Sequence, residues 1–377
     1  MNQKELNEIR RRIRPEHNNI RNIYGCYVNT AKEIISSFDA SVALLNQEEA
    51  EKYFYLLKKT LSGALGKNLA ELAFETRSVA EGKDLRLLSA MLEKGTDDDV
   101  LRDEFFRSII STIDMQDQNY LILLAQDIYD VPHYGKDGEA DERGDVYRYL
   151  LCSICPVKSG KAELGYSAED RRFCSATAGQ IAAAPECGFL YPAFDGRTAN
   201  LYGALLYSKN ISLSHQDLAD AVFHASVPMC AGKQKEAFED VLTGALQKGC
   251  TFDVIQAMHE QLSERIEAYK ESKDPEPMVI TCEEMGEILE KSGAESTAVD
   301  AFKKEYHKKL GNEAVLRPGN LVNPKKMEIS LPEIKISVDP KFSYLVQTRI
   351  MDGKKYIIIS ADSGVEINGV SVGIAQQ

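Results

Sequence analysis

A block of strand-length apolar runs between Asn119 and Lys209 constrains the fold of this chain more than any other stretch. The runs read NYLILLAQDIYDV, VYRYLLCSICPV, GFLYPAF and NLYGALLYSK, and the segment DGRT at 195–198 joins the last two. They are rich in β-branched and aromatic residues, lack a helical period and are bounded by turn-forming residues, which is typical of β-strands. The block therefore predicts a mostly antiparallel sheet.

Upstream of this block, helical and strand patterns alternate. Asn46 is a typical N-cap residue, and the apolar stripe after it predicts a helix that runs to Leu65, with Gly66 as its C-terminal cap. Two further apolar stripes with a helical period come directly before the block. The predicted elements are a helix over 2–13, a hairpin over 23–37, a helix over 46–65, a strand over 69–74 and helices over 84–93 and 98–113.

Downstream of the block, the pattern becomes helical. Ser214 and Asp217 have the spacing of a capping box, and Thr281 and Glu284 form a full one, so both pairs predict the start of a helix. Between them, apolar stripes predict two more helices, and another helix is predicted over 296–310.

The chain closes as β structure, because Asp-Gly at 352–353 and Asn-Gly at 368–369 are typical two-residue hairpin turns. We predict an α+β protein with a central, mostly antiparallel sheet and flanking helices, a helical middle, and a C-terminal domain of a helix pair plus β-hairpins. The predicted domains are 1–210, 211–272 and 278–377, with the polar linker KESKDPEP before the last.

Composition indicates a cytoplasmic protein. The first residues, MNQKELNEIRRR, are charged, so we expect neither a signal peptide nor an anchor there. No apolar run approaches the roughly 20 residues that a membrane span needs, so we expect no membrane association. The chain has eight cysteines, which we expect to be reduced and mostly buried.

The net charge of −13 argues against a generally basic surface, but the charge is uneven. Residues 1–21 carry six Lys and Arg against three Asp and Glu, and residues 303–326 carry seven against two. Such patches could contact nucleic-acid phosphates, although arginines on an exposed helix and lysines at a helix end are also ordinary surface. The candidate residues are Arg10, Arg11, Arg12, Arg14, Arg21, Lys303, Lys304, Lys308 and Lys309, with Lys325 and Lys326 after them.

Cys152 and Cys155 have the spacing of half a zinc site or a redox pair. The nearby downstream cysteines, Cys174 and Cys187, do not have the spacing that would complete a four-ligand zinc site. The pair lies inside a predicted strand, where residues three apart point to opposite faces. Core packing is therefore the favoured interpretation, and we predict no metal site, cofactor or catalytic residue.

Other motifs fail on inspection. The helical segment at 259–263 begins like a zinc-protease motif, but Ser263 replaces the second histidine. The segment GALGK at 63–67 lacks the glycine spacing of a phosphate-binding loop, and the acidic residues at 127–145 lack the glycine of a calcium-binding loop. We interpret 133–145 and 159–185 as irregular polar loops that could line a pocket beside the sheet.

Several segments spread over the chain carry a family resemblance: KELNEIRRRIRPEHNNI, GCYVN, LLAQDIYDVP, YLLCSICPVK, AAPECGFLYPAFDGRTANLY, HEQLSERIEAYKESKDPEP and DGKKYIIISADSGVEINGV. They are similar to a bacterial family of Gram-positive anaerobes that is catalogued as a domain of unknown function. The resemblance implies no activity, because the family has none assigned.

A second resemblance is one of layout. A helix runs into the strand of LRDEFFRSIISTIDMQDQNYLILLAQDIYDV, an apolar strand YLLCSICPV follows, HEQL lies at 259–262, and the chain closes with EIKISVDPKFSYLVQTRIMDGKKYIII. This order resembles the nucleoid-associated protein family of Gram-negative bacteria, whose members are also acidic. The resemblance implies association with the nucleoid, and no binding residue is transferred from it.

Three functional hypotheses follow. The first is a non-enzymatic, nucleoid-associated protein that binds DNA or nucleoprotein through the basic patches near both ends. The second is an enzyme or small-ligand-binding protein whose pocket lies beside the sheet at 133–145 and 159–185. The third is an assembly or scaffold role, as a homodimer formed through the helical middle.

Overall fold

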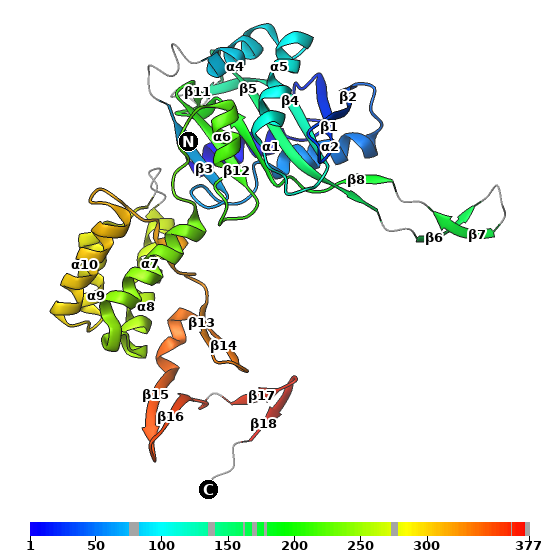
Figure 1. Ribbon diagram of the computed structural model, residues 1–377. Helices are drawn as coiled ribbons and strands as arrows, with labels where there is room; N and C mark the ends of the chain where they lie inside the picture. The colour runs from blue at the N-terminus through cyan, green and yellow to red at the C-terminus, as the bar shows by residue number, and fades with distance from the viewer. Residues whose placement is uncertain are drawn as a thin grey trace. The chain divides into compact units, whose positions relative to one another are not determined.

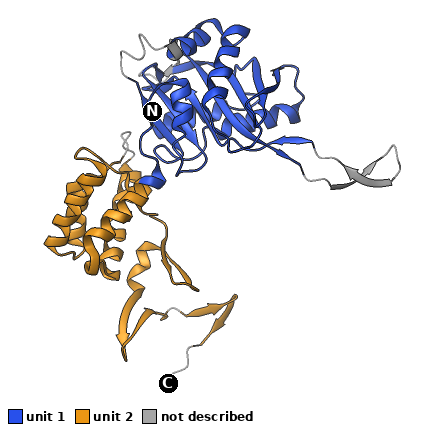
Figure 2. Ribbon diagram, viewed as in Figure 1, with its two compact units in different colours: residues 1–233 blue, residues 234–377 orange. Residues whose placement is uncertain are grey.

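The computed structural model describes residues 1–74, 83–134, 140–160, 163–167, 172–176, 179–272, 278–362 and 364–373. The chain forms two compact units, Met1–Lys233 and Gln234–Gln377 (Figures 1 and 2). The protein is α+β and is built on a large antiparallel sheet, as predicted. The division into three domains stays a prediction.

The sheet lies in the first unit and has the strand order β2-β1-β4-β5-β9-β12-β3, with β8 paired to the far end of β5 (Figure 1). Each neighbouring pair is antiparallel. The 119–209 block supplies the centre of the sheet. The strands are β1 (Asn22–Val28), β2 (Ile34–Ser41), β3 (Leu69–Ala73), β4 (Tyr120–Tyr134), β5 (Ala140–Ser159), β8 (Gln180–Ala182), β9 (Cys187–Tyr191) and β12 (Gly203–Ser208).

Helices cover both faces of this sheet. α4 (Lys83–Lys94), α5 (Asp99–Thr112) and α6 (Gln216–Val222) contribute to the core on one face. α1 (Gln3–Arg12) and α2 (Gln47–Lys59) contribute to the core on the other. The central strands are apolar at almost every position because each of their faces is buried.

The β10 (Ala193–Asp195) and β11 (Thr198–Asn200) hairpin confirms the predicted DGRT turn. The turn residues Gly196 and Arg197 both have positive φ, at 59° and 61°. The predicted hairpin over 23–37 is also confirmed as β1 and β2.

α2 ends six residues earlier than predicted. Thr60 leaves the helix and is fully buried, and its hydroxyl lies 2.6 Å from that of Ser153 on β5. The next residue, Leu61, packs in the core without being helical. Gly66 therefore does not cap the helix, and its positive φ of 71° belongs to the turn before β3.

The two predicted polar loops are largely wrong. β4 and β5 extend through the first one, so residues 133–134 and 140–145 are strand, while 135–139 lie outside the described residues. In the second, β6 (Glu163–Ser167) pairs with β7 (Arg172–Ala176), and β8 pairs with β5. A ladder that continues beyond the core forms backbone hydrogen bonds without needing apolar alternation, which is why the sequence pattern did not reveal it.

The Ser214 capping box is also wrong. His215 occupies the N-cap position of α6 in a left-handed conformation, with no side-chain cap. Asp217 instead accepts a hydrogen bond from the backbone N–H of Asp114, at 3.0 Å. Its carboxylate ties α6 to the segment after α5.

The second unit contains a helical core. Phe238, Phe302 and Tyr306 are buried at its centre, and the Thr281 capping box is confirmed by hydrogen bonds in both directions with Glu284. The helices are α7 (Ala231–Leu246), which begins in the first unit, η1 (Gln247–Gly249), α8 (Phe252–Ser272), α9 (Cys282–Lys291), α10 (Ser296–Leu310) and α11 (Pro318–Leu321). Residues 273–277 of the predicted linker lie outside the described residues.

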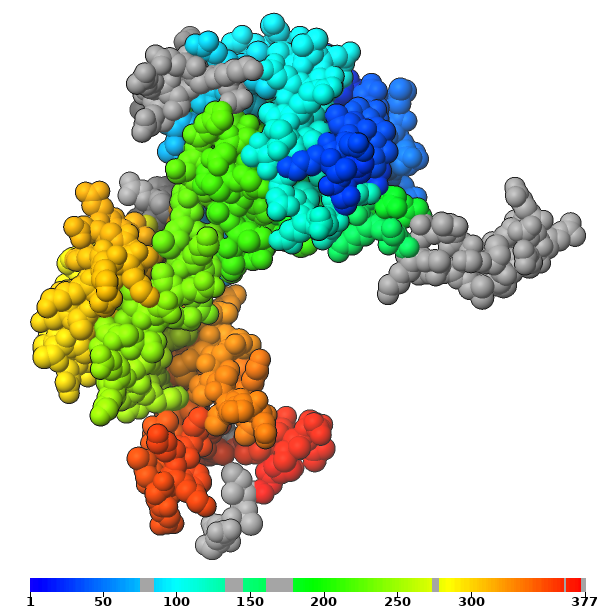
Figure 3. Space-filling view, in the orientation of Figure 1, coloured from blue at the N-terminus to red at the C-terminus, as the bar shows by residue number. Residues whose placement is uncertain are grey.

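Three two-stranded ribbons follow (Figure 1), and their atoms are orange to red in Figure 3. The predicted turns at 352–353 and 368–369 are confirmed, and all four turn residues have positive φ. Several large apolar side chains of these ribbons are exposed, among them Ile350 and Ile359. The elements are β13 (Met327–Ser330), β14 (Lys335–Val338), η2 (Pro340–Leu345), β15 (Val346–Met351), β16 (Lys354–Ile359), β17 (Val365–Ile367) and β18 (Val370–Val372).

Candidate functional site

The Arg10 side chain forms hydrogen bonds with the backbone of the same unit. Its Nε donates to the carbonyl of Leu61, and its Nη2 donates to the carbonyl of Gly63, both at 2.5 Å. Partial burial lowers the pKa of the guanidinium. Arg10 thus fastens α1 to the segment that follows α2, where the carbonyl groups have no helical partner.

Arg12, which is half-buried, forms an ion pair with the buried Asp127 on β4. Its Nε and Nη2 donate to the carboxylate at 3.0 and 3.2 Å, and its guanidinium lies over the ring of Tyr129. Asp127 is 1% exposed and also accepts from the Tyr149 hydroxyl and the Asn19 backbone, both at 2.8 Å. The pair therefore anchors α1 to the sheet.

The other three arginines of the N-terminal patch are exposed: Arg11, Arg14 and Arg21. The structure thus separates the patch into two residues with internal contacts and three that face solvent. Only the second group is open to a partner.

The α10 lysines lie in the second unit and are partly neutralised. Lys308 forms an ion pair with Glu305 at 3.4 Å, and Lys309 forms one with Asp240 at 3.0 Å. Lys304 is exposed, whereas the aliphatic part of Lys303 is placed against Gly286. Exposed ion pairs are weak, so these lysines remain able to exchange partners.

Cys152 and Cys155 are completely buried in β5. Cys152 belongs to the core beneath α4 and α5, while Cys155 lies three residues along the strand and points to the opposite face. Burial raises the pKa of Cys155 to about 12 and that of Cys152 well above its usual range. Both thiols stay protonated, which suits packing and not redox chemistry.

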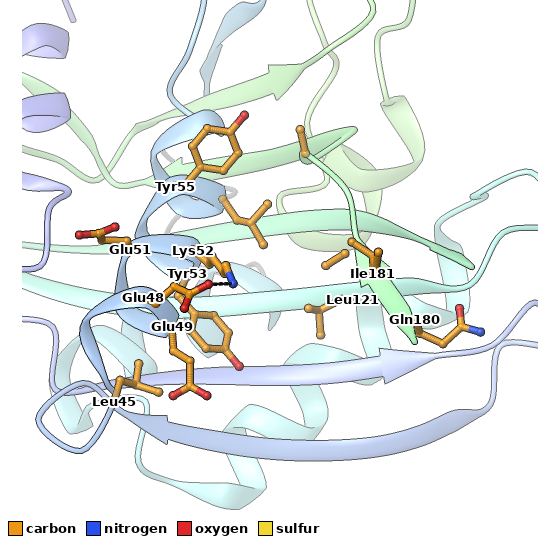
Figure 4. Close-up of a pocket in the computed structure, with 13 residues that line it drawn as sticks. Leu45, Glu48, Glu49, Glu51, Lys52, Tyr53, Tyr55, Leu121, Gln180 and Ile181 are labelled. Carbon is orange, nitrogen blue, oxygen red and sulfur yellow. Dashed lines mark hydrogen bonds and ion pairs between the residues drawn. The ribbon is translucent and has the colours of Figure 1, made fainter. Parts of the chain in front are cut away.

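A groove of about 740 Å³ lies beside the sheet, between α2 and β8 (Figure 4). Ala50, Phe54 and Leu57 turn into the core, so the adjacent face of α2 forms one wall. Leu121 and Ile181 lie across from it. Most of the lining surface is apolar, and the volume falls within the range of small-ligand pockets.

The rim of the groove is acidic. Glu48, Glu49 and Glu51 supply three carboxylates, and Lys52 is the one cation among the residues that line it. Lys52 forms an ion pair with Glu48 at 2.6 Å, and this hydrogen bond lowers the pKa of the Glu48 carboxyl. The groove therefore favours a ligand that is apolar along its length and positively charged.

The sequence-based hypothesis predicted a pocket lined by 133–145 and 159–185, and one of these two segments lines the groove. The 159–185 segment supplies Gln180, Ile181, Ala182 and Ala184, but no described residue of 133–145 lines the groove. The α2 wall was not predicted from the sequence. The exposed Tyr55 in a polar helix face was a usable signal, since large aromatic residues on such a face often mark binding surfaces.

The family described as "Domain of unknown function (DUF4317)" matches residues 1–370. The chain belongs to this family. The match confirms the whole-chain resemblance found in the sequence, and DUF4317 carries no assigned activity. No curated protein matches the chain. The layout resemblance to nucleoid-associated proteins stays a hypothesis.

Proposed function

We propose that this DUF4317 protein is a non-enzymatic binding protein that holds an extended peptide segment in the groove between α2 and β8. The observation that carries the proposal is the combination of apolar walls with an acidic rim. Aliphatic side chains of the segment would contact Leu121 and Ile181, and its basic side chains would face the glutamates of α2. Ile181 is 55% exposed, so a ligand can bury substantial apolar area there.

Replacing Ile181 by serine is expected to weaken peptide binding about 4- to 12-fold. Full burial of an isoleucine side chain contributes roughly 1.5–3 kcal/mol, about half of which is available to the ligand because Ile181 is 55% exposed, and each 1.4 kcal/mol corresponds to a factor of about ten in affinity. Fluorescence anisotropy with a labelled peptide of alternating valine and lysine measures the affinity. A peptide of alternating valine and glutamate tests the charge preference.

Two variants sharpen this test. Ile35→Ser removes a similarly exposed isoleucine outside the groove and should leave binding unchanged. Lys52→Gln releases Glu48 from its ion pair and should strengthen binding of the lysine peptide by about two- to five-fold. Equal binding of both peptides, or equal binding by Ile181→Ser and the parent protein, would contradict the proposal.

Nucleic-acid binding is the second candidate, because Arg11, Arg14 and Arg21 are exposed. The triple variant Arg11→Ala/Arg14→Ala/Arg21→Ala is expected to lose most retention of duplex DNA in a gel-shift assay at low salt. Each lost phosphate contact should reduce the salt slope of the affinity by about 0.9. Arg10 and Arg12 are left intact because they hold α1 in place.

The matched control removes three exposed lysines of the same unit, Lys67, Lys94 and Lys158. It changes the net charge by the same amount and should bind DNA as the parent protein does. If both triple variants lose binding equally, the effect is one of net charge and the arginines form no site. Absence of binding by the parent protein at low salt would refute the hypothesis.

We also propose a cytoplasmic location. Each cysteine described with its side chain is a free thiol, which is consistent with a reducing compartment. None of the described helices is long and apolar enough to span a membrane. Association with the nucleoid would follow from DNA binding and is tested by the same gel shift.

A further inference from the structure

Three metal-ligating side chains converge in the second unit, where α9 and α10 pack together. Cys282 and Glu283 are the first two residues of α9, and His307 lies in the last turn of α10. The thiol sulfur, one carboxylate oxygen and one ring nitrogen all lie within 4.8 Å of one another. Residues 25 positions apart in the sequence are brought together by the antiparallel helix pair.

None of these three side chains has a strong competing contact in the described part of the chain. The Cys282 thiol is almost fully buried, and its hydrogen bond to the Lys303 carbonyl is long, at 3.9 Å. The His307 Nε2 lies 3.9 Å from the Glu283 Oε1, which is too far for a hydrogen bond. All three groups are therefore free to turn toward a common point.

We propose that Cys282, Glu283 and His307 bind one zinc ion. Zinc accepts sulfur, nitrogen and oxygen ligands in a tetrahedral arrangement, at about 2.3 Å from sulfur and about 2.0 Å from nitrogen or oxygen. Such bond lengths place neighbouring ligand atoms about 3.3–3.6 Å apart, so small side-chain rotations close the site. Glu283 is exposed, and water completes the fourth position.

Charge balance supports this assignment. On binding, the sulfur–zinc bond replaces the S–H bond, the proton passes to solvent, and nothing is oxidised or reduced. The thiolate and the carboxylate then neutralise the two positive charges of the ion.

Cobalt(II) is the first probe, because it takes the same ligands and its bond to a thiolate produces a near-ultraviolet charge-transfer band. We expect the full-length reduced protein to develop this band with one equivalent of cobalt and to lose it when zinc displaces the cobalt. Cys282→Ser should abolish the band. His307→Gln and Glu283→Gln should weaken cobalt binding about 10-fold or more.

The control is Cys250→Ser, which removes a partly exposed thiol of the same unit that is outside the cluster and should leave the band unchanged. His307 and Glu283 are partly or largely exposed, so their variants should fold, and circular dichroism checks this for Cys282→Ser. Absence of a thiolate band in the parent protein overturns the proposal. So does a band that persists in Cys282→Ser or that is equally strong in His307→Gln.

Discussion

Arg12→Ala is expected to lower the free energy of unfolding of the unit formed by residues 1–233 by about 3 kcal/mol. Removing one partner of a buried ion pair leaves the other charge without compensation, which typically costs about 3–5 kcal/mol. Asp127 keeps the hydrogen bonds from Tyr149 and Asn19, so the loss should fall at the low end. Urea unfolding followed by circular dichroism measures it.

The control is Arg11→Ala, one residue earlier on the same helix, where the side chain is exposed. Arg11→Ala should change the free energy of unfolding by no more than about 0.5 kcal/mol, the usual range for surface substitutions. Similar losses from both variants would show that the Asp127 contact does not anchor α1. Such a result would also reopen Arg12 as a candidate for contacts with a partner.

The core of the fold could be predicted from local sequence signals. Thr281 with Glu284, and the Asp-Gly and Asn-Gly pairs at 352–353 and 368–369, act within a few residues, so their structure follows from their own chemistry. The central strands could also be predicted, because burial on both faces makes their runs continuously apolar. The errors lie where a distant partner decides the structure.

Thr60 and Asp217 illustrate such errors. α2 ends at Thr60, whose hydroxyl meets that of Ser153, 93 residues away. The Asp217 carboxylate accepts from the backbone N–H of Asp114 and does not cap α6. Local patterns contain no information on either contact. The same reason applies to Arg12 in the N-terminal basic patch, because the sequence does not reveal that its side chain is bound to Asp127.

The candidate sites were harder to predict than the fold. The groove is lined by α2 and β8, which are more than a hundred residues apart in the sequence. The sequence of α2 is that of an ordinary amphipathic helix. Cys282 and Glu283 belong to a capping-box segment, so the sequence explains them as the start of a helix. Nothing in the sequence indicates that His307 lies near them. Residues such as Tyr55 can indicate one wall of such a site, but which elements form the site together is known only from their packing.

Gly188→Ala is expected to destabilise the first unit strongly. Gly188 lies on β9 opposite Ser153 of β5. A Cβ atom there would lie 2.3 Å from the Cys152 carbonyl oxygen and 2.6 Å from the Thr60 Cγ2. The carbonyl belongs to a strand paired on both sides and cannot move away, so we expect a loss of about 3 kcal/mol or more in urea unfolding, at the upper end of overpacking costs.

Two further variants separate the causes of this loss. Gly244→Ala adds the same methyl group in the interior of α7, where nothing lies within 4 Å, and should stabilise its unit by up to about 1 kcal/mol. Thr60→Ser removes the Cγ2 but keeps the hydroxyl that meets Ser153, so the double variant with Gly188→Ala should recover only part of the loss. Full recovery would show that the Cys152 carbonyl yields and that the threonine methyl group alone restricts this position. A negligible loss for Gly188→Ala itself would mean that β9 can shift along β5, and the close approach of these two strands would then not require glycine.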